Sequence, residues 1–189
     1  MAQKKERIKI ENAELLTPVI FKNRKAQKLS GNVIFSKEKT TMYCDSAFRF
    51  TDTGIVEAYG SLRILKGDSI TLTGDQLIFN EVSDMARVTG RKVVLSDGNM
   101  TLTTTALDYD IKNNTGSYFE KGEIISADNN LTSTIGYYYA SSKSLFFKDS
   151  VVLVNPRYTM RGDTLKYAVN TERAFFFGPT FIEADSNLI

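Results

Sequence analysis

Residues 72–80 read Leu-Thr-Gly-Asp-Gln-Leu-Ile-Phe-Asn, and the pattern of this stretch returns about every 30 residues along the chain. It starts with an apolar residue, continues with a small residue two positions later, and carries an apolar residue at position five and mostly an aromatic one at seven. Successive starts lie 32, 30, 30, 29 and 29 residues apart, at Ile10, Met42, Leu72, Leu102, Leu131 and Met160. A fixed period of this kind indicates a stacked β-architecture built from one unit.

A second landmark follows each start after 18 to 21 residues, at Gly31, Gly60, Gly90, Gly122, Ser150 and Gly178. An apolar stretch such as Val33-Ile34-Phe35 usually comes next. The segments between landmarks are rich in β-branched and aromatic residues, and turn sequences such as Asp97-Gly98-Asn99 separate them. Each unit is therefore predicted to be two kinked strands joined by tight turns.

We predict an all-β fold, an elongated antiparallel β-jelly roll of about six repeats of roughly 30 residues. It would form a single domain over residues 1–189, with residues 1–7 disordered or at an edge. A parallel β-helix is the alternative, although its coils are usually shorter and lack hairpin turns at both ends. Only residues 10–21 are ambiguous, and Pro18 argues against a long helix there.

Composition excludes several classes of function. The chain contains no histidine, which removes Ser-His-Asp and Cys-His nucleophiles and the usual zinc sites. The net charge of +2, with both signs interspersed, gives no basic stripe for nucleic acid. No stretch approaches the ~18 apolar residues that a membrane helix needs. A single cysteine, Cys44, permits no intrachain disulfide. We therefore expect no enzymatic activity, no cofactor, no metal site and no nucleic-acid partner.

Three acidic residues, Asp45, Asp75 and Asp163, occupy the same position of the repeat. They could hold a cation or act as an acid and a base in a carbohydrate-active solenoid. Alternatively, an acidic side chain at a strand kink accepts hydrogen bonds from nearby backbone N–H groups. Spacing by whole repeats favours the backbone-acceptor interpretation.

The small residues two positions after each start also have two interpretations. They are Asn12, Cys44, Gly74, Thr104, Ser133 and Gly162. Glycines there could satisfy a β-bulge. If this position points inward together with the start, small side chains could instead leave an apolar slot between two facing sheets.

Four segments resemble the OstA family, namely residues 31–35 (GNVIF), 42–48 (MYCDSAF), 58–60 (AYG) and 72–80 (LTGDQLIFN). Members of that family include the periplasmic lipopolysaccharide transport protein LptA and the N-terminal region of the outer-membrane protein LptD. The likeness covers about residues 8–185. It implies a β-jelly roll that shields lipopolysaccharide acyl chains, bridges the inner and outer membranes, and joins end to end with components of similar fold.

On this resemblance we expect a periplasmic protein of a Gram-negative bacterium whose signal peptide has been removed. The candidates for an apolar lining that contacts acyl chains are Met42, Leu72, Leu77, Phe79, Leu102, Leu107, Tyr109, Leu131, Tyr138, Met160, Leu165 and Tyr167. Two positions break the pattern. Arg49 replaces an aromatic residue, and Gly136 replaces a leucine, so the lining is not uniform.

The last repeat ends in Phe175-Phe176-Phe177-Gly178-Pro179-Thr180-Phe181-Ile182, which is unusually apolar for an edge. Either this edge pairs head to tail with the first repeat of another copy, or the phenylalanines cap the core and Pro179 blocks the edge. Two alternative functions also remain open. One is a structural or assembly module of a larger outer-membrane protein with a packed core, and the other is a carbohydrate-binding or carbohydrate-active β-solenoid.

Overall fold

The computed structural model describes residues 7–67, 70–139, 141–142, 144–168, 171 and 173–184. The segment predicted to be disordered or at an edge, residues 1–7, lies outside this range except for Arg7. The chain divides into two compact units, Met1–Leu95 and Ser96–Ile189, which we call unit 1 and unit 2 and describe separately. The single-domain assignment stays a prediction.

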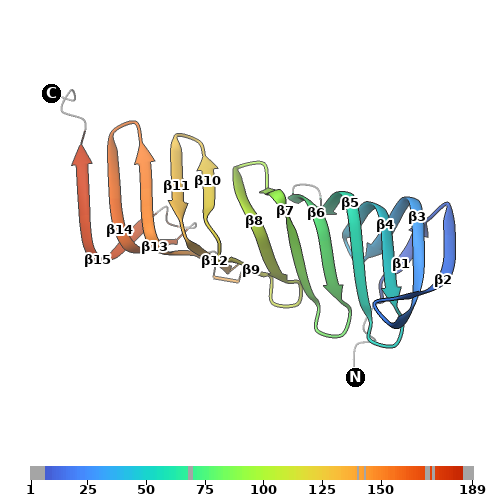
Figure 1. Ribbon diagram of the computed structural model, residues 1–189. Helices are drawn as coiled ribbons and strands as arrows, with labels where there is room; N and C mark the ends of the chain where they lie inside the picture. Colours follow the sequence, from blue (N-terminus) through green and yellow to red (C-terminus); the bar gives the residue numbers. More distant parts are fainter. Residues whose placement is uncertain are drawn as a thin grey trace, which may run out of the picture. The chain divides into compact units, whose positions relative to one another are not determined.

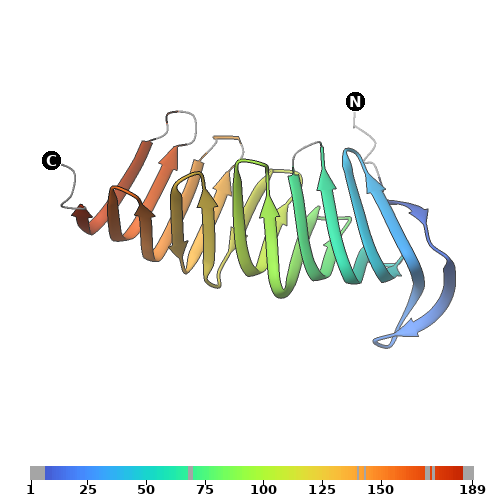
Figure 2. The ribbon, with the colours of Figure 1, turned by 90° about the horizontal axis from the view of Figure 1, so that it is seen from above.

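Unit 1 is built from antiparallel strands. They are β1 (Lys9–Asn12), β2 (Leu15–Phe21), β3 (Arg24–Lys37), β4 (Thr40–Phe50), β5 (Ile55–Lys66), β6 (Ile70–Asn80) and β7 (Met85–Ser96), the last of which ends at the unit boundary. Their order in the sheet is β1-β3-β4-β5-β6-β7, and β2 also pairs with β3. The ambiguous residues 10–21 therefore form strands, and Pro18 lies in β2, where an edge strand tolerates a missing N–H. Figure 2 shows the β2–β3 hairpin, in blue, extending beyond the neighbouring strands.

Bulges interrupt the long strands β3 and β5 of unit 1 near their middles. The register shifts between Ser30 and Val33 of β3, and between Tyr59 and Leu62 of β5. At these shifts Gly31 and Gly60 have φ angles of 78° and 74°, which few side chains permit. The recurring glycine of the sequence thus marks the bulges of β3 and β5. We call this line of bulges the crease.

The crease folds the two halves of the unit 1 sheet toward each other. Lys37 ends β3, whereas Asp84 lies in the turn between β6 and β7, at the opposite end of the strands. In a flat sheet a strand of 14 residues would hold such ends about 45 Å apart. Instead the two side chains form a salt bridge, and the Lys37 ammonium lies 5.2 Å from the centroid of the Phe79 ring. The strand ends opposite the crease, including Lys37 and the turn 81–84, therefore meet at what we call the mouth of unit 1.

Unit 2 has the same organisation with shorter strands. They are β8 (Met100–Asp110), β9 (Thr115–Tyr118), β10 (Gly122–Ser126), β11 (Asn129–Ser133), β12 (Ile135–Tyr139), β13 (Ser144–Asn155), β14 (Tyr158–Ala168) and β15 (Arg173–Ala184). One half-sheet joins β10 and β11 to residues 100–103 of β8 and 152–154 of β13. The other joins β9 and β12 to residues 108–110 of β8 and 144–148 of β13. Figure 1 shows these two strand pairs on opposite sides of the bend.

The predicted fold class is confirmed. The register of every pairing given above is antiparallel, which excludes the parallel β-helix alternative. The predicted turn chemistry is also present. The Asp97 carboxylate accepts hydrogen bonds from the backbone N–H groups of Asn99 and Met100, at 2.9 Å each. In the next turn the Asn113 backbone N–H donates to Asp110, which lowers the pKa of that carboxyl.

Candidate functional site

The inward face of the first half of unit 1 carries an uninterrupted apolar row. Cross-strand pairing places its members side by side, in the order Ile10, Phe35, Met42, Ile64 and Leu72. Directly paired residues of an antiparallel sheet point to the same face, so these side chains line one surface. Phe35, Met42 and Leu72 are buried. The starts of three repeats thus alternate with Phe35 and Ile64, which the intervening strands supply.

The second half of unit 1 presents smaller side chains to the same interior. Leu29, Ala47, Ala58 and Leu77 form one row, and all four are buried. The next row toward the mouth contains Gln27, Arg49, Val56 and Phe79. Arg49 therefore stands on the inward face between Gln27 and Val56, in the position where most other repeats carry an aromatic residue.

Unit 2 repeats the arrangement with a longer row on its first half-sheet. Pairing places side by side Leu102, Ile124, Leu131, Leu153, Met160 and Ile182. Leu102 and Leu131 flank Ile124 and are 6% and 7% exposed. By contrast Ile125, the next residue of β10, faces the other way and is 50% exposed. The alternation defines which face of this half-sheet is interior.

The second half-sheet of unit 2 faces inward with tyrosines. One row contains Tyr109, Gly116, Tyr138, Leu145 and Tyr167. The three tyrosines keep intermediate exposure although they point inward, as does Met160 on the other half-sheet. Burial raises the pKa of the Tyr138 phenol, and the charges of Tyr109 and Asp97 add to the shift. The interior of unit 2 is therefore apolar and still partly accessible to water near the strand ends.

Large side chains fill the interior at the crease. The Tyr118 ring lies against the Cα atoms of Gly122 and Gly136, where any Cβ would overlap it. Its hydroxyl shares a 2.6 Å hydrogen bond with Ser133 Oγ, and burial raises the pKa of this tyrosine. Val88 occupies the space beside Gly74 in unit 1 in the same way. The space beside the small residues Gly74 and Ser133 is thus occupied at the crease.

The aspartate column serves the bulges. Asp75 accepts a hydrogen bond from the Arg91 backbone N–H at 2.9 Å, and Asp45 accepts one from Ser61 Oγ at 3.0 Å. Glu14 accepts one from the Asn32 side chain at the first bulge. Among the described residues, no group of three acidic, cysteine or histidine side chains is arranged to hold a metal ion. Of these bonds only that of Asp75 fits the backbone-acceptor interpretation, because Asp45 and Glu14 accept from side chains, and none of the three favours carbohydrate chemistry.

All twelve residues predicted to line the interior avoid full exposure. Met42, Leu72, Leu77, Phe79, Leu102, Leu107, Leu131 and Leu165 are buried, and Tyr109, Tyr138, Met160 and Tyr167 are half-buried. The structure brings them together in two separate sets, four in unit 1 and eight in unit 2. The sequence prediction missed Phe35, Ile64, Ile124 and Leu153, which complete the rows. The apolar stretch after each glycine landmark carried their signal.

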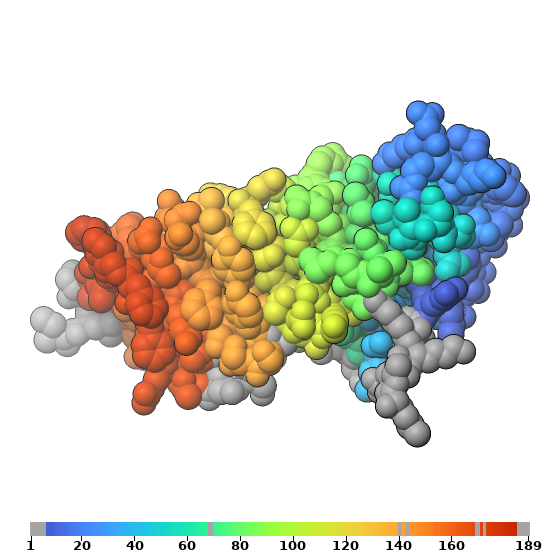
Figure 3. Space-filling model, turned by 90° about the horizontal axis from the view of Figure 1, so that it is seen from below, coloured from blue at the N-terminus to red at the C-terminus, as the bar shows by residue number. Residues whose placement is uncertain are grey.

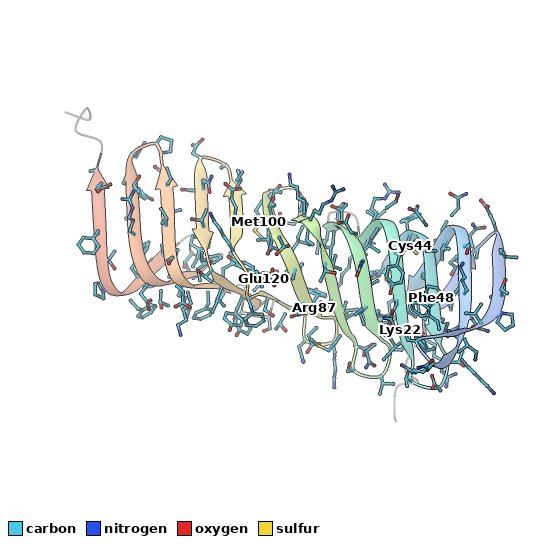
Figure 4. All side chains as sticks on the ribbon, viewed as in Figure 1. Lys22, Cys44, Phe48, Arg87, Met100 and Glu120 are labelled. Atoms are coloured by element: carbon cyan, nitrogen blue, oxygen red, sulfur yellow. The ribbon has the colours of Figure 1, made fainter. Side chains whose placement is uncertain are left out.

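The outer faces also carry ordered side chains. In unit 1 the rings of Phe21 and Phe48 stack at 3.8 Å, beside a Lys22–Glu57 salt bridge. Figure 4 shows the labelled Lys22 and Phe48 close together at this end. Burial opposes ionisation of Glu57, but hydrogen bonds from Lys22 and Tyr59 outweigh it and lower the pKa of the carboxyl. These contacts hold the β2–β3 hairpin against β4 and β5.

Cys44 lies in the small-residue column and is buried. Burial raises the pKa of its thiol to about 11, so the reactive thiolate is scarce at neutral pH. The side chain therefore acts as a small apolar group, as the sequence predicted.

The described residues thus form two antiparallel β-units with apolar interiors. The family model described as OstA-like protein matches residues 5–163, and the chain belongs to that family. No curated protein matches the chain. Among solved structures, the chain is similar to LptH, described as the LptA homologous periplasmic component of the conserved lipopolysaccharide transport device from Pseudomonas aeruginosa. The two are 11% identical, with 77% of this chain and 94% of that chain covered and a TM-score of 0.33.

Among the described residues, no helix has the length and the apolar character needed to cross a membrane.

Proposed function

We propose that this protein is a non-enzymatic, periplasmic module that binds lipopolysaccharide and passes it between the inner and the outer membrane. The acyl chains of the lipopolysaccharide would lie between the half-sheets of each unit, away from the crease. Membership of the OstA-like family supports the proposal. The observation that carries it is the set of inward-facing residues that remain partly accessible, Tyr109, Tyr138, Met160 and Tyr167.

The energetics of acyl chains explain why such an interior is useful. Burying one methylene group is worth ~0.8 kcal/mol, so a chain of about a dozen carbons costs on the order of 10 kcal/mol to expose to water. The twelve predicted lining residues offer mainly aliphatic and aromatic surface, which recognises hydrocarbon by burial alone. Tyrosine hydroxyls near the strand ends suit the border between hydrocarbon and water.

The direct test is to ask what the purified protein carries. We expect organic extraction of protein purified from a lipopolysaccharide-producing Gram-negative host to release lipopolysaccharide in near-stoichiometric amounts. Native mass spectrometry should show the matching mass increase. Protein that binds no lipid, either as purified or after incubation with lipopolysaccharide, would contradict the proposal.

A second candidate function is a scaffold module with a packed core within an outer-membrane assembly. The filled crease favours it, because Tyr118 and Val88 occupy the space beside small residues. A packed core holds no lipid, so the extraction experiment separates the two candidates.

We further propose that copies of the chain, or components of similar fold, join through the edge strands. In unit 2 the strand β15 pairs with β14 and exposes Phe175, Phe177, Phe181 and Ile182. Figure 3 shows β15, in red, at the edge of that unit. In unit 1 the edge strand β2 exposes Leu15, Leu16 and Ile20. Unpaired strand edges with apolar side chains favour strand addition.

Charged substitutions on β15 test this association. We expect Phe177→Glu combined with Phe181→Glu to shift the protein toward monomer, with at least a tenfold weaker self-association in analytical ultracentrifugation. Val154→Glu is the matched control, because Val154 is also exposed but lies on β13, away from the edge. Equal self-association of all variants would contradict an interface at β15.

A further inference from the structure

Charged residues gather at the mouth of unit 1, on faces that are mainly apolar. Lys37 follows Val33 and Phe35 on the inward face of β3 and is only 7% exposed. Arg49 stands on the inward face of the opposite half-sheet, in the row of Val56 and Phe79. Two cations therefore face the interior from its two walls, within reach of any molecule that enters from the mouth.

One turn neutralises both cations. The Lys37 ammonium forms a salt bridge with Asp84, whose side chain is also largely buried. The Arg49 guanidinium lies 3.4 Å from a carboxylate oxygen of Glu81. Both carboxylates come from the turn 81–84 between β6 and β7. Because a buried charge needs a partner, these carboxylates supply it when no anionic ligand is present.

The Lys37 ammonium lies between apolar side chains of the interior and the charged turn at the mouth. Its methylene stem continues the apolar row, and its nitrogen lies over the face of the buried Phe79 ring. A ligand with apolar chains against Phe35, Leu77 and Phe79 would place a headgroup at this level. An anionic headgroup would meet two cations there, which pair readily with phosphate oxygens.

We propose that Lys37 and Arg49 form an anchor for the phosphate groups of an amphiphilic ligand, and that Asp84 and Glu81 occupy this anchor until the ligand displaces them. The proposal rests on the proposed function and adds to it the headgroup chemistry and its location in unit 1. On binding, the phosphate takes over the two cations, and the carboxylates of the turn 81–84 return to water. No covalent step is involved.

The test compares two ligands that differ by one phosphate, lipid A with two phosphates and lipid A with one. Affinities are measured by displacement of a fluorescent fatty acid from the full chain. We expect the wild-type protein to bind the bisphosphate at least tenfold more tightly. Lys37→Met and Arg49→Met should each reduce that ratio severalfold, and the double variant should abolish it. A fluorescent fatty alcohol of the same chain length, used as an uncharged second probe, should still bind the double variant. Lys25→Met, an exposed change on the same strand β3, is the matched control and should keep the ratio.

A second pair of variants tests the anchor by changing the carboxylates and leaving the two cations in place. Asp84→Asn and Glu81→Gln leave the cations in place without their carboxylate partners, so both should tighten bisphosphate binding severalfold. Inorganic phosphate alone should displace neither probe at millimolar concentration, because the anchor needs the chains for affinity; displacement would identify a free-phosphate site and overturn the proposal. Equal affinity of wild-type protein for both forms of lipid A would overturn the anchor and leave the proposed function intact. Binding of neither form would overturn the proposed function and the anchor together.

Discussion

Replacing Leu102 and Leu131 together by aspartate is expected to reduce lipopolysaccharide binding by at least a hundredfold. The two side chains flank Ile124 in the inward row of unit 2. Two carboxylates there would face acyl chains without partners, and desolvating each would cost several kcal/mol. A hundredfold loss of affinity corresponds to about 2.7 kcal/mol, so even part of this desolvation cost is enough to produce it. Binding is measured by displacement of a fluorescent lipopolysaccharide.

The control for this variant changes the other face of the same half-sheet. Ile125→Asp and Val154→Asp introduce the same carboxylates at exposed positions of β10 and β13, and we expect both to bind like the wild type. Circular dichroism shows whether each variant keeps its β-structure. A folded Leu102→Asp, Leu131→Asp protein that binds lipopolysaccharide normally would refute the assignment of this row as lining.

Truncating Tyr118 to alanine is expected to cause the largest loss of stability of any single change in unit 2, ~3–5 kcal/mol. The ring is 3% exposed and fills the crease between Gly122 and Gly136, which have no side chains to close the space it would leave. Chemical denaturation followed by far-ultraviolet circular dichroism measures the change in the free energy of unfolding.

Tyr118→Phe separates the ring from its hydroxyl. This variant keeps the packing and loses the hydrogen bond to Ser133, so we expect a loss of only ~1 kcal/mol. Gly136→Val should be destabilising for the complementary reason, because its side chain would overlap the Tyr118 ring. A Tyr118→Ala protein as stable as the wild type would show that the ring does not support the crease.

The period of the sequence predicted most of the fold because side-chain direction and strand length are local properties. The recurring glycine falls at the bulges of β3 and β5, where Gly31 and Gly60 adopt the left-handed angles that explain the residue type. The repeat starts fall in the inward rows because each repeat bends at the same position, so the same face of each strand points to the interior. Of the three consecutive tyrosines, Tyr138 points inward and Tyr137 and Tyr139 point outward, as an extended segment requires.

What the sequence could not predict depends on which strands face each other. The repeat positions used to predict the lining lie on only one strand of each hairpin. Phe35 and Ile124 lie on the partner strands and were therefore missed, although they complete the rows. The filling of the small-residue positions by Tyr118 and Val88 follows from packing across the crease, which no repeat pattern encodes. The sequence indicated Arg49 only as an interruption of the apolar lining. Its pairing with Glu81, in the same turn that pairs with Lys37, depends on the fold and could not be predicted.

The most direct test of the central claim is photo-crosslinking in living cells from a pair of adjacent positions. A photoreactive residue is placed at Ile124, inside the row of unit 2, and in a second strain at Ile125, on the opposite face. We expect a lipopolysaccharide adduct from Ile124 and none from Ile125. Adducts from Ile125 alone, or from neither position, would contradict an interior that carries acyl chains.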